Sequence, residues 1–340
     1  MKKSTSNTTY ITGILEAIDI SPQRVLTHHG KPYGQPLSNA YIQQPSTRML
    51  FQSLEGLLYA VYYSRNNISQ EQMQTPPSYP ELEQSLRRLS ASNRSTEGFD
   101  EGWTIENIDL QGQIMARKGN LKRQVFAGEF ISTSMFHQRP LLHAGIKLIS
   151  RREHKDPGAG FYYVFSNTAG EDNPGQLVRI YFNIKPEGAP VLIEQCTTIL
   201  NELQVPFSFK CLQHPFYYTR CDTAVLYFDK RYSPVVFEAL KEIHASVRSY
   251  LQPDCPAFTR VLAPGVAFAE NPLKAEESFG THCSKMIAQG IMNAYTKGLP
   301  RQEWLNEIRI TIEQKHKYAS MDLLYLNPET NYPYSFPELY

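Results

Sequence analysis

Four basic residues lie inside stretches whose composition is otherwise typical of buried β-strands. They are Arg179 in LVRIYFN, Lys210 in FSFKCL, Arg220 in YYTRCD and Arg260 in FTRVL. Burying isolated charges is costly, so these positions need an explanation. If the side chains meet in one concavity, two or three cations there form a site for a dianion such as a phosphate monoester. If they point outward, they belong to an ordinary solvated face of an antiparallel sheet.

Two histidines and one carboxylate lie near these cations in the sequence. His214 follows the strand-like FSFKCL, and His282 lies in SFGTHCSK, just past the expected start of a helix, where backbone N–H groups favour an anion. Each is a candidate catalyst or a structural residue. Asp222, two residues after Arg220, is either a partner that orients that guanidinium or an ordinary turn carboxylate.

The motifs of several other enzyme classes are absent from the sequence. The chain has no GxxxxGK[ST], no GxGxxG that opens a helix, no HExxH and no GxSxG. Its five cysteines include no CxxC pair and no tight Cys/His spacing, so neither a disulfide framework nor a structural zinc is expected. We expect no metal and no cofactor.

Composition and charge are those of a globular protein. The 340 residues are 41% hydrophobic and 12% aromatic, which is enough for a sizeable core. The formal net charge is +1, so the overall field typical of nucleic-acid or membrane-surface binders is missing. The first residues are polar where a signal peptide is apolar, and no apolar run approaches roughly 20 residues. We expect a cytoplasmic protein with no nucleic-acid or membrane partner.

The elements that must position the basic residues begin with helices. From Tyr10 to about Asn66 the pattern of apolar residues is helical, with Ser46 or Thr47 as a cap. A proline-rich connector near residues 68–79 and a short helix in PELEQSLRRLSAS follow.

Beyond Gly98 the period of the apolar residues changes to two. WTIENIDLQGQIMARKGNLKRQVFAGEF has turn signals at Gln111-Gly112 and Gly119-Asn120, which predicts an antiparallel β-meander. Later strands and helices alternate irregularly. The prediction is an α+β fold with two regions. Residues 1–97 form a helical region, and residues 98–340 form a mixed, largely antiparallel sheet with C-terminal helices, on which the helical region packs.

Two segments resemble a known family. VRIYFNIKPEGAPVLIEQCTTILNELQVPFSFKCLQHPFYYTRCDTAVLYF and APGVAFAENPLKAEESFGTHC are similar to the HopA-type effector family, which includes plant-pathogen type III effectors and the lyases of class V lanthipeptide and thioamitide biosynthesis. The resemblance covers roughly residues 100–298. Its most specific parts are R-x-Y-x-N at Arg179, F-K at Phe209 and Lys210, Y-x-R-C-D ending at Asp222, and S-F-G-x-H-C from Ser278 to Cys283.

The resemblance implies phosphothreonine or phosphoserine lyase chemistry in ribosomal peptide biosynthesis. In the peptide-tailoring members, a partner kinase phosphorylates a precursor peptide and the lyase removes phosphate to leave a dehydroamino acid. Such an elimination needs a base at the α-carbon, fixed positive charge at the leaving phosphate and a proton donor. A lysine can act as the base where burial and neighbouring cations depress its pKa.

We assign a role to each candidate residue as a hypothesis, because the resemblance brings the motif positions across without telling which lysine or which histidine does which job. The base is Lys210, with Lys185 and, more weakly, Lys274 as rivals. The phosphate clamps are Arg179 and Arg220, with Arg260 as a weaker third. The acid is His214 or His282, and the orienting groups are Tyr181, Asn183 and Asp222.

Two other functions stay open at this point. The alternative is a type III secreted effector that docks on a host immune protein and is held by a chaperone. The Ser/Thr-rich start of the sequence is the feature that favours this effector function. It could also be an inactive relative that binds phosphopeptides as a scaffold for a kinase partner.

Overall fold

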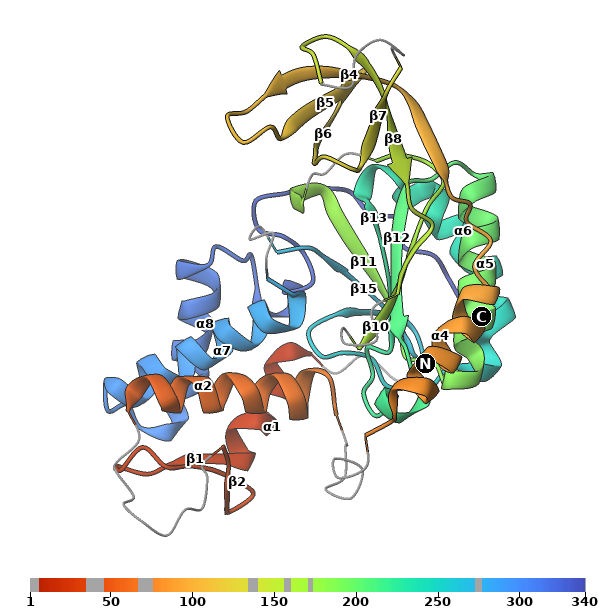
Figure 1. Cartoon of the computed structure of the whole chain (residues 1–340). Helices are drawn as coiled ribbons and strands as arrows, with labels where there is room; N and C mark the ends of the chain where they lie inside the picture. Colours follow the sequence, from red (N-terminus) through yellow and green to blue (C-terminus); the bar gives the residue numbers. More distant parts are fainter. Residues whose placement is uncertain are drawn as a thin grey trace.

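In the computed structural model, a seven-stranded sheet forms the centre of the fold (Figure 1). The structure describes residues 6–34, 46–66, 76–133, 140–155, 160–170, 174–272 and 277–339. The strand order is β14-β15-β11-β13-β12-β10-β9. The strands are β9 (Glu153–Lys155), β10 (Phe161–Phe165), β11 (Leu177–Phe182), β12 (Phe207–Leu212), β13 (Ala224–Asp229), β14 (Arg260–Ala263) and β15 (Val266–Glu270). The α+β prediction is confirmed, and every neighbouring pair of these described strands is antiparallel rather than mixed.

One face of this sheet is covered by two helices and is largely apolar. Alternate residues of β11, among them Val178 and Ile180, pack with α5 (Ala189–Glu202) and α6 (Ser233–Val247). The period of two in the sequence therefore separates the residues of this core from the polar residues of the same strands.

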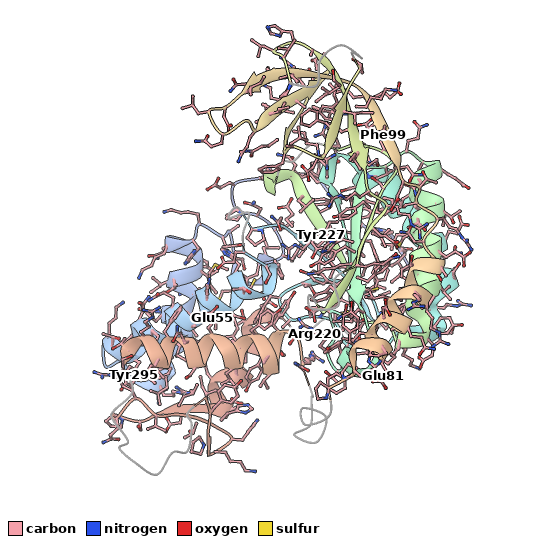
Figure 2. All side chains as sticks on the ribbon, in the orientation of Figure 1. Glu55, Glu81, Phe99, Arg220, Tyr227 and Tyr295 are labelled. Atoms are coloured by element: carbon pink, nitrogen blue, oxygen red, sulfur yellow. The ribbon has the colours of Figure 1, made fainter. Side chains whose placement is uncertain are left out.

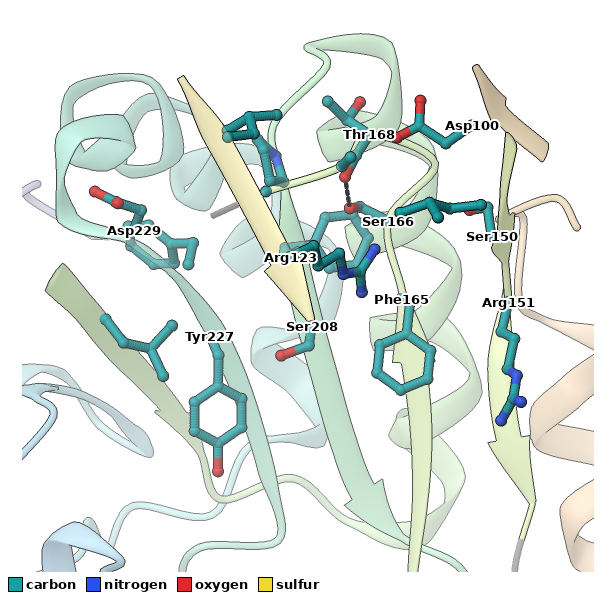
Figure 3. Close-up of a pocket in the computed structure, with 18 of the residues that line it drawn as sticks. Asp100, Arg123, Ser150, Arg151, Phe165, Ser166, Thr168, Ser208, Tyr227 and Asp229 are labelled. Carbon is teal, nitrogen blue, oxygen red and sulfur yellow. Dashed lines mark hydrogen bonds between the residues drawn. The ribbon is translucent and has the colours of Figure 1, made fainter. Parts of the chain in front are cut away.

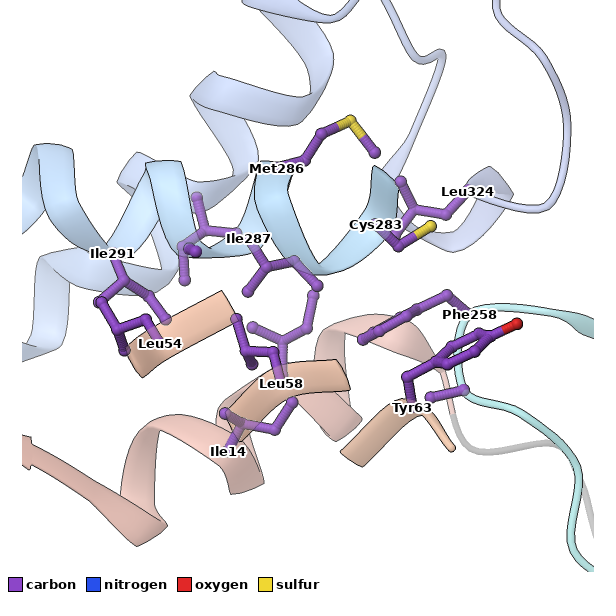
Figure 4. Close-up of a cluster of buried hydrophobic side chains, with 14 of the residues drawn as sticks. Ile14, Leu54, Leu58, Tyr63, Phe258, Cys283, Met286, Ile287, Ile291 and Leu324 are labelled. Carbon is purple, nitrogen blue, oxygen red and sulfur yellow. The ribbon is translucent and has the colours of Figure 1, made fainter. Parts of the chain in front are cut away.

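Helices also cover part of the opposite face. They are α1 (Asn7–Ala17), α2 (Thr47–Leu57), α7 (Phe279–Thr296) and α8 (Trp304–Ile310). Figure 4 shows how Leu54 and Leu58 of the N-terminal part lie beside Ile287 and Ile291 of α7. The same buried cluster includes residues from Ile11 to Leu324, so its core extends across the expected boundary between residues 97 and 98.

The prediction of helix throughout the first 66 residues is wrong for one segment. Residues Ile18–Ile20, Leu26–His28 and Lys31–Pro32 form the small antiparallel sheet β1-β2-β3. Proline at position 22 cannot continue a helix, and His29 and Gly30 both have positive φ, 49° and 74°, as a two-residue hairpin turn requires.

The predicted β-meander is confirmed as part of a separate five-stranded sheet above the central one (Figure 1). Its order is β6-β5-β4-β8-β7. The strands are β4 (Gly98–Ile108), β5 (Ile114–Lys118), β6 (Leu121–Val125), β7 (Phe130–Ser132) and β8 (Gly145–Ser150). The sheet has its own apolar core around Trp103 and Ile105, and β6 forms one edge. The short predicted helix is α4 (Tyr79–Ala91), begun by a Ser78–Glu81 capping box.

The end of α2 is a π-helical segment, Leu58–Tyr63, that packs unusually closely on α7. A Cβ atom placed on Gly280 would lie 2.2 Å from Cε1 of Tyr63. The glycine of the S-F-G-x-H-C motif is therefore required by the packing of Tyr63. π-Helical turns of this kind often lie at functional sites.

We predict that Gly280→Ala lowers the free energy of unfolding by about 2 kcal/mol, because the added methyl group overpacks the contact with Tyr63. Urea denaturation measures this change. Gly13→Ala in α1 is the matched control, since its Cβ would meet nothing within 4 Å. Equal stability of the two variants would contradict this account of Gly280.

Candidate functional site

The face of the central sheet that carries the polar residues is only half covered by helices. Tyr181, Val225 and Ala267 belong to the core beneath the helical layer. Farther across the same face, side chains of β10, β12 and β13 are half-buried. We call them the open strip: Phe161, Tyr163, Phe165, Ser208, Lys210 and Tyr227.

Strand register orders the open strip in two rows that end at the predicted site residues. One row runs Phe165–Ser208–Tyr227–Arg179, and the other runs Tyr163–Lys210–Val225–Tyr181. Both rows lie on one face, because residues opposite each other in antiparallel strands share a face.

A cavity of about 560 Å³ separates the open strip from the five-stranded sheet. Figure 3 shows Phe165, Ser208 and Tyr227 on its central-sheet side and Arg123 projecting from β6. Three residues of the open strip therefore line a recess, whereas Lys210 and Arg179 are not part of its lining. Its size is in the range of ligand-binding sites.

Arg179 is a buried cation that has no carboxylate partner among the described residues. Its exposure is 8%. Nε donates to Asn271 Oδ1 at 3.1 Å, Nη2 donates to the same oxygen, and Nη1 donates to the Tyr181 hydroxyl at 3.5 Å. Among the described residues, these bonds use three of the five guanidinium N–H groups. Two N–H groups are therefore left to bind a ligand.

Lys210 and Arg179 approach the same aromatic ring. The Arg179 guanidinium carbon lies 5.3 Å from the centroid of the Tyr227 ring, and Lys210 Nζ lies 5.8 Å from it. Lys210 Nζ is also 4.4 Å from the centroid of Phe161. In the part of the chain that the structure describes, Lys210 has only these aromatic contacts and forms no ion pair. Two cations thus converge without a neutralising carboxylate between them, as a phosphate dianion requires.

A line of tyrosines connects Arg179 with the N-terminal part of the chain. Tyr181 and Tyr63 interact electrostatically through their buried side chains, and the Tyr63 ring stacks on Tyr59 at 5.4 Å between centroids. Burial raises the pKa of both Tyr181 and Tyr63, and the neighbouring Tyr181 and Asp222 raise that of Tyr63 further. These hydroxyls therefore remain protonated at neutral pH and can fix the position of Arg179.

Arg220 lies at the far end of this line and is already neutralised. Its guanidinium forms a two-pronged ion pair with Asp222, and Nη2 also donates to the Tyr59 hydroxyl at 2.9 Å. Burial opposes its charge, but the hydrogen bonds and charge of Asp222 raise the pKa of Arg220. Figure 2 shows Arg220 at the lower end of the sheet, below Tyr227. Of the two interpretations left open for Asp222, the structure shows the contact with Arg220, and this pair lies beside the site rather than at its centre.

Neither predicted histidine belongs to the Arg179–Lys210 cluster. His214 begins the 3₁₀ turn Pro215–Tyr217, where Nδ1 accepts a hydrogen bond from Phe216 N at 3.2 Å. Burial lowers the pKa of His214, although the charge of Glu81 opposes this effect. His282 is held on both ring nitrogens, by Glu277 at 2.9 Å and by the Tyr318 hydroxyl at 3.1 Å. Both positions are explained by local structure, so we withdraw them as candidate acids.

Three further predicted residues lie apart from the cluster. Arg260 is on the opposite face, where its guanidinium carbon is 4.2 Å from the centroid of Phe336. Lys185 is exposed and precedes the 3₁₀ turn Pro186–Gly188. Asn183 is buried beyond the end of β11, where its amide donates to Asp254 O at 3.0 Å. Lys274 lies outside the described residues.

Sequence reasoning missed Tyr227 and Asn271, which contact Arg179 directly. Alternation in AVLYFD places Tyr227 opposite Leu226 and Phe228, so the period of two could have revealed it. Asn271 follows β15, and its contact depends on the pairing of β15 with β11, for which the sequence has no signal.

The described residues hold no group of three or more His, Cys, Asp or Glu side chains placed for a metal ion.

None of the helices in the described ranges has both the length and the apolarity to cross a bilayer.

We predict that Asp222→Asn lowers the free energy of unfolding by about 2–4 kcal/mol, because it leaves the mostly buried Arg220 without its counter-charge. Chemical denaturation measures the loss. Asp254→Asn removes an exposed partner of Arg65 and should cost less than about 1 kcal/mol. A small effect of Asp222→Asn would show that Arg220 is not held by this pair.

No curated protein matches the chain. Two solved structures are similar to it, both of effector proteins from Pseudomonas syringae. The one from pv. tomato strain DC3000 has 13% identity and a TM-score of 0.47, covering 84% of this chain and 91% of that chain. The one from pv. syringae strain 61 has 15% identity and a TM-score of 0.43, covering 83% and 89%.

A family match provides the identification. The model of the HopA1 effector protein family matches residues 154–323, half of the 340-residue chain, which include the central sheet and α7. The chain therefore belongs to the HopA1 effector protein family.

Proposed function

We propose that this protein is a phosphothreonine or phosphoserine lyase, which eliminates phosphate from a phosphorylated precursor peptide and leaves a dehydroamino acid. One observation carries the proposal: buried Arg179 has no carboxylate partner among the described residues and converges with Lys210 on the ring of Tyr227, which lines a cavity. A charge buried in this way is costly unless it meets an anion, and a phosphate monoester supplies one with two charges.

The proposed reaction uses Lys210 as the base and Arg179 as the phosphate clamp. Lys210 Nζ, after releasing its own proton to solvent, removes the α-proton, and the electron pair of the Cα–H bond forms the Cα=Cβ bond. The Cβ–O bond breaks, its electron pair leaves with the phosphate, and the leaving oxygen takes a proton from water, while the proton gained by Lys210 returns to solvent. The charge that develops on the leaving oxygens is stabilised by a guanidinium that Asn271 and Tyr181 already hold in place.

The proposal also names the partners of the reaction. Residues of both sheets line the cavity beside the open strip, and a segment of the precursor peptide would lie between them. A partner kinase would supply the phosphorylated residue, and the reaction needs no cofactor because the charge stabilisation comes from side chains.

The family description favours a second candidate. An effector acts on or binds another protein, so the same recess could hold a phosphorylated segment of a host protein without converting it. Binding of a phosphorylated segment to such a scaffold would also depend on Arg179, as in the lyase, but the scaffold would release no phosphate.

We predict that the full-length protein converts a phosphothreonine peptide to its dehydrated form, detected by mass spectrometry as loss of phosphoric acid. Lys210→Met and Arg179→Gln should each slow this conversion by about 10²–10³-fold, because they remove the base and the charge at the leaving group. Arg260→Gln and Lys185→Met are matched controls that change the same residue types away from the cluster, and they should keep the normal rate.

Three results would contradict parts of this proposal. A restored hydroxyl in the product would indicate a phosphatase instead of a lyase. Unchanged elimination by Lys210→Met would remove Lys210 as the base. An unchanged peptide that still binds in an Arg179-dependent manner would favour the scaffold.

A further inference from the structure

The elimination proposed above needs a proton at the oxygen that leaves. A phosphate monoester carries two negative charges, and it gains a third when the Cβ–O electron pair leaves with it. A group that donates a proton to this oxygen as the bond breaks therefore lowers the barrier. Both predicted histidines are held elsewhere by local contacts, so the side chains of the cluster itself are the place to look for this donor.

Tyr227 lies between the two cations of the cluster. Strand register places it directly opposite Arg179. The centroid of its ring is 5.3 Å from the Arg179 guanidinium carbon and 5.8 Å from Lys210 Nζ. Figure 3 shows its hydroxyl pointing away from Asp229. Val225, the neighbour on the other side along the same face of β13, belongs to the row of Lys210, so the hydroxyl points toward that row.

The hydroxyl of Tyr227 is placed to donate to a ligand. The side chain is half-buried and lines the cavity, and its oxygen forms no hydrogen bond with the described residues. Two other tyrosines of this face differ from it. Tyr181 is buried and its hydroxyl already accepts a hydrogen bond from Arg179. Tyr163 lies on β10, which two strands separate from β11 and Arg179.

We propose that Tyr227 is a further catalytic residue, whose hydroxyl gives the leaving phosphate oxygen its proton in place of water. The O–H bond of Tyr227 breaks as the Cβ–O bond breaks, and the hydrogen forms a new O–H bond on the phosphate. Arg179 and Lys210 lie beside the negative charge left on the tyrosine oxygen and offset it. Solvent then returns one proton to Tyr227 and accepts the proton that Lys210 removed from Cα, so atoms and charges balance. This inference rests on the proposed function, because it assigns a step of that elimination.

The order of the strands matches the order of the reacting atoms. Lys210 is on β12, Tyr227 is on the next strand, β13, and Arg179 is on β11 beyond it. In the substrate, Cα is followed by Cβ, the leaving oxygen and phosphorus. A substrate that extends across these strands thus meets the base at Cα, the proton donor at the leaving oxygen and the clamp at the phosphate.

The test uses Tyr227→Phe, which removes the hydroxyl and keeps the ring that contacts both cations. The probe is a heptapeptide with a central phosphothreonine between alanines. Its single-turnover elimination rate, followed by mass spectrometry, should fall about 10²–10³-fold. Its dissociation constant, measured by fluorescence anisotropy with Lys210→Met present to prevent turnover, should change less than about threefold. Tyr217→Phe, in the 3₁₀ turn Pro215–Tyr217, is the matched control and should keep the wild-type values.

A second substrate separates proton donation from a structural role. In the same heptapeptide with sulfothreonine, the leaving sulfate is the anion of a strong acid and needs no proton. Tyr227→Phe should therefore slow this elimination by less than about threefold. Equal slowing of both substrates, or an unchanged rate with phosphothreonine, would overturn the role of Tyr227 but leave the proposed function intact. Absence of phosphothreonine elimination by the wild-type protein would overturn both.

Discussion

The candidate site depends on one constraint: the charge of Arg179 must be held inside the protein without a carboxylate among the described residues. The neutral oxygens of Asn271 and Tyr181 accept hydrogen bonds from the Arg179 guanidinium, and the Tyr227 ring lies next to the same group. Neutral partners keep the cation in place without cancelling its charge. An ion pair such as Arg220–Asp222 also keeps its cation in place, but it cancels the positive charge.

This constraint explains why the N-terminal helices belong to the same structure as the site. Tyr181 is fixed by Tyr63, which the π-helical end of α2 places against Gly280 of α7. A segment of the chain some 120 residues before β11 therefore supports the position of Arg179, the proposed phosphate clamp. The helical layer ends where the open strip begins, and the five-stranded sheet forms the other wall of the recess.

Much of this arrangement could be predicted from local patterns in the sequence, and the rest depends on contacts between distant segments. The period of two placed Arg179 and Tyr181 on one face, and the meander, α5, α6 and α7 follow from spacing and capping residues. The pairing of β11 with β13 and β15 has no such local signal, so Tyr227 and Asn271 were missed. Arg260 was wrongly grouped with Arg179, because a sequence does not tell which faces of separate strands coincide.

The central claim is that Arg179 provides an anion site, and a comparison of affinities tests it most directly. Isothermal titration calorimetry would measure the dissociation constants of a phosphothreonine peptide and its unphosphorylated counterpart for the wild-type protein and for Arg179→Lys. The account predicts a strong preference for the phosphorylated peptide, about 100-fold, that is largely lost when the two-pronged guanidinium becomes an ammonium. Equal affinities of wild type for both peptides, or a preference that survives Arg179→Lys unchanged, would contradict it.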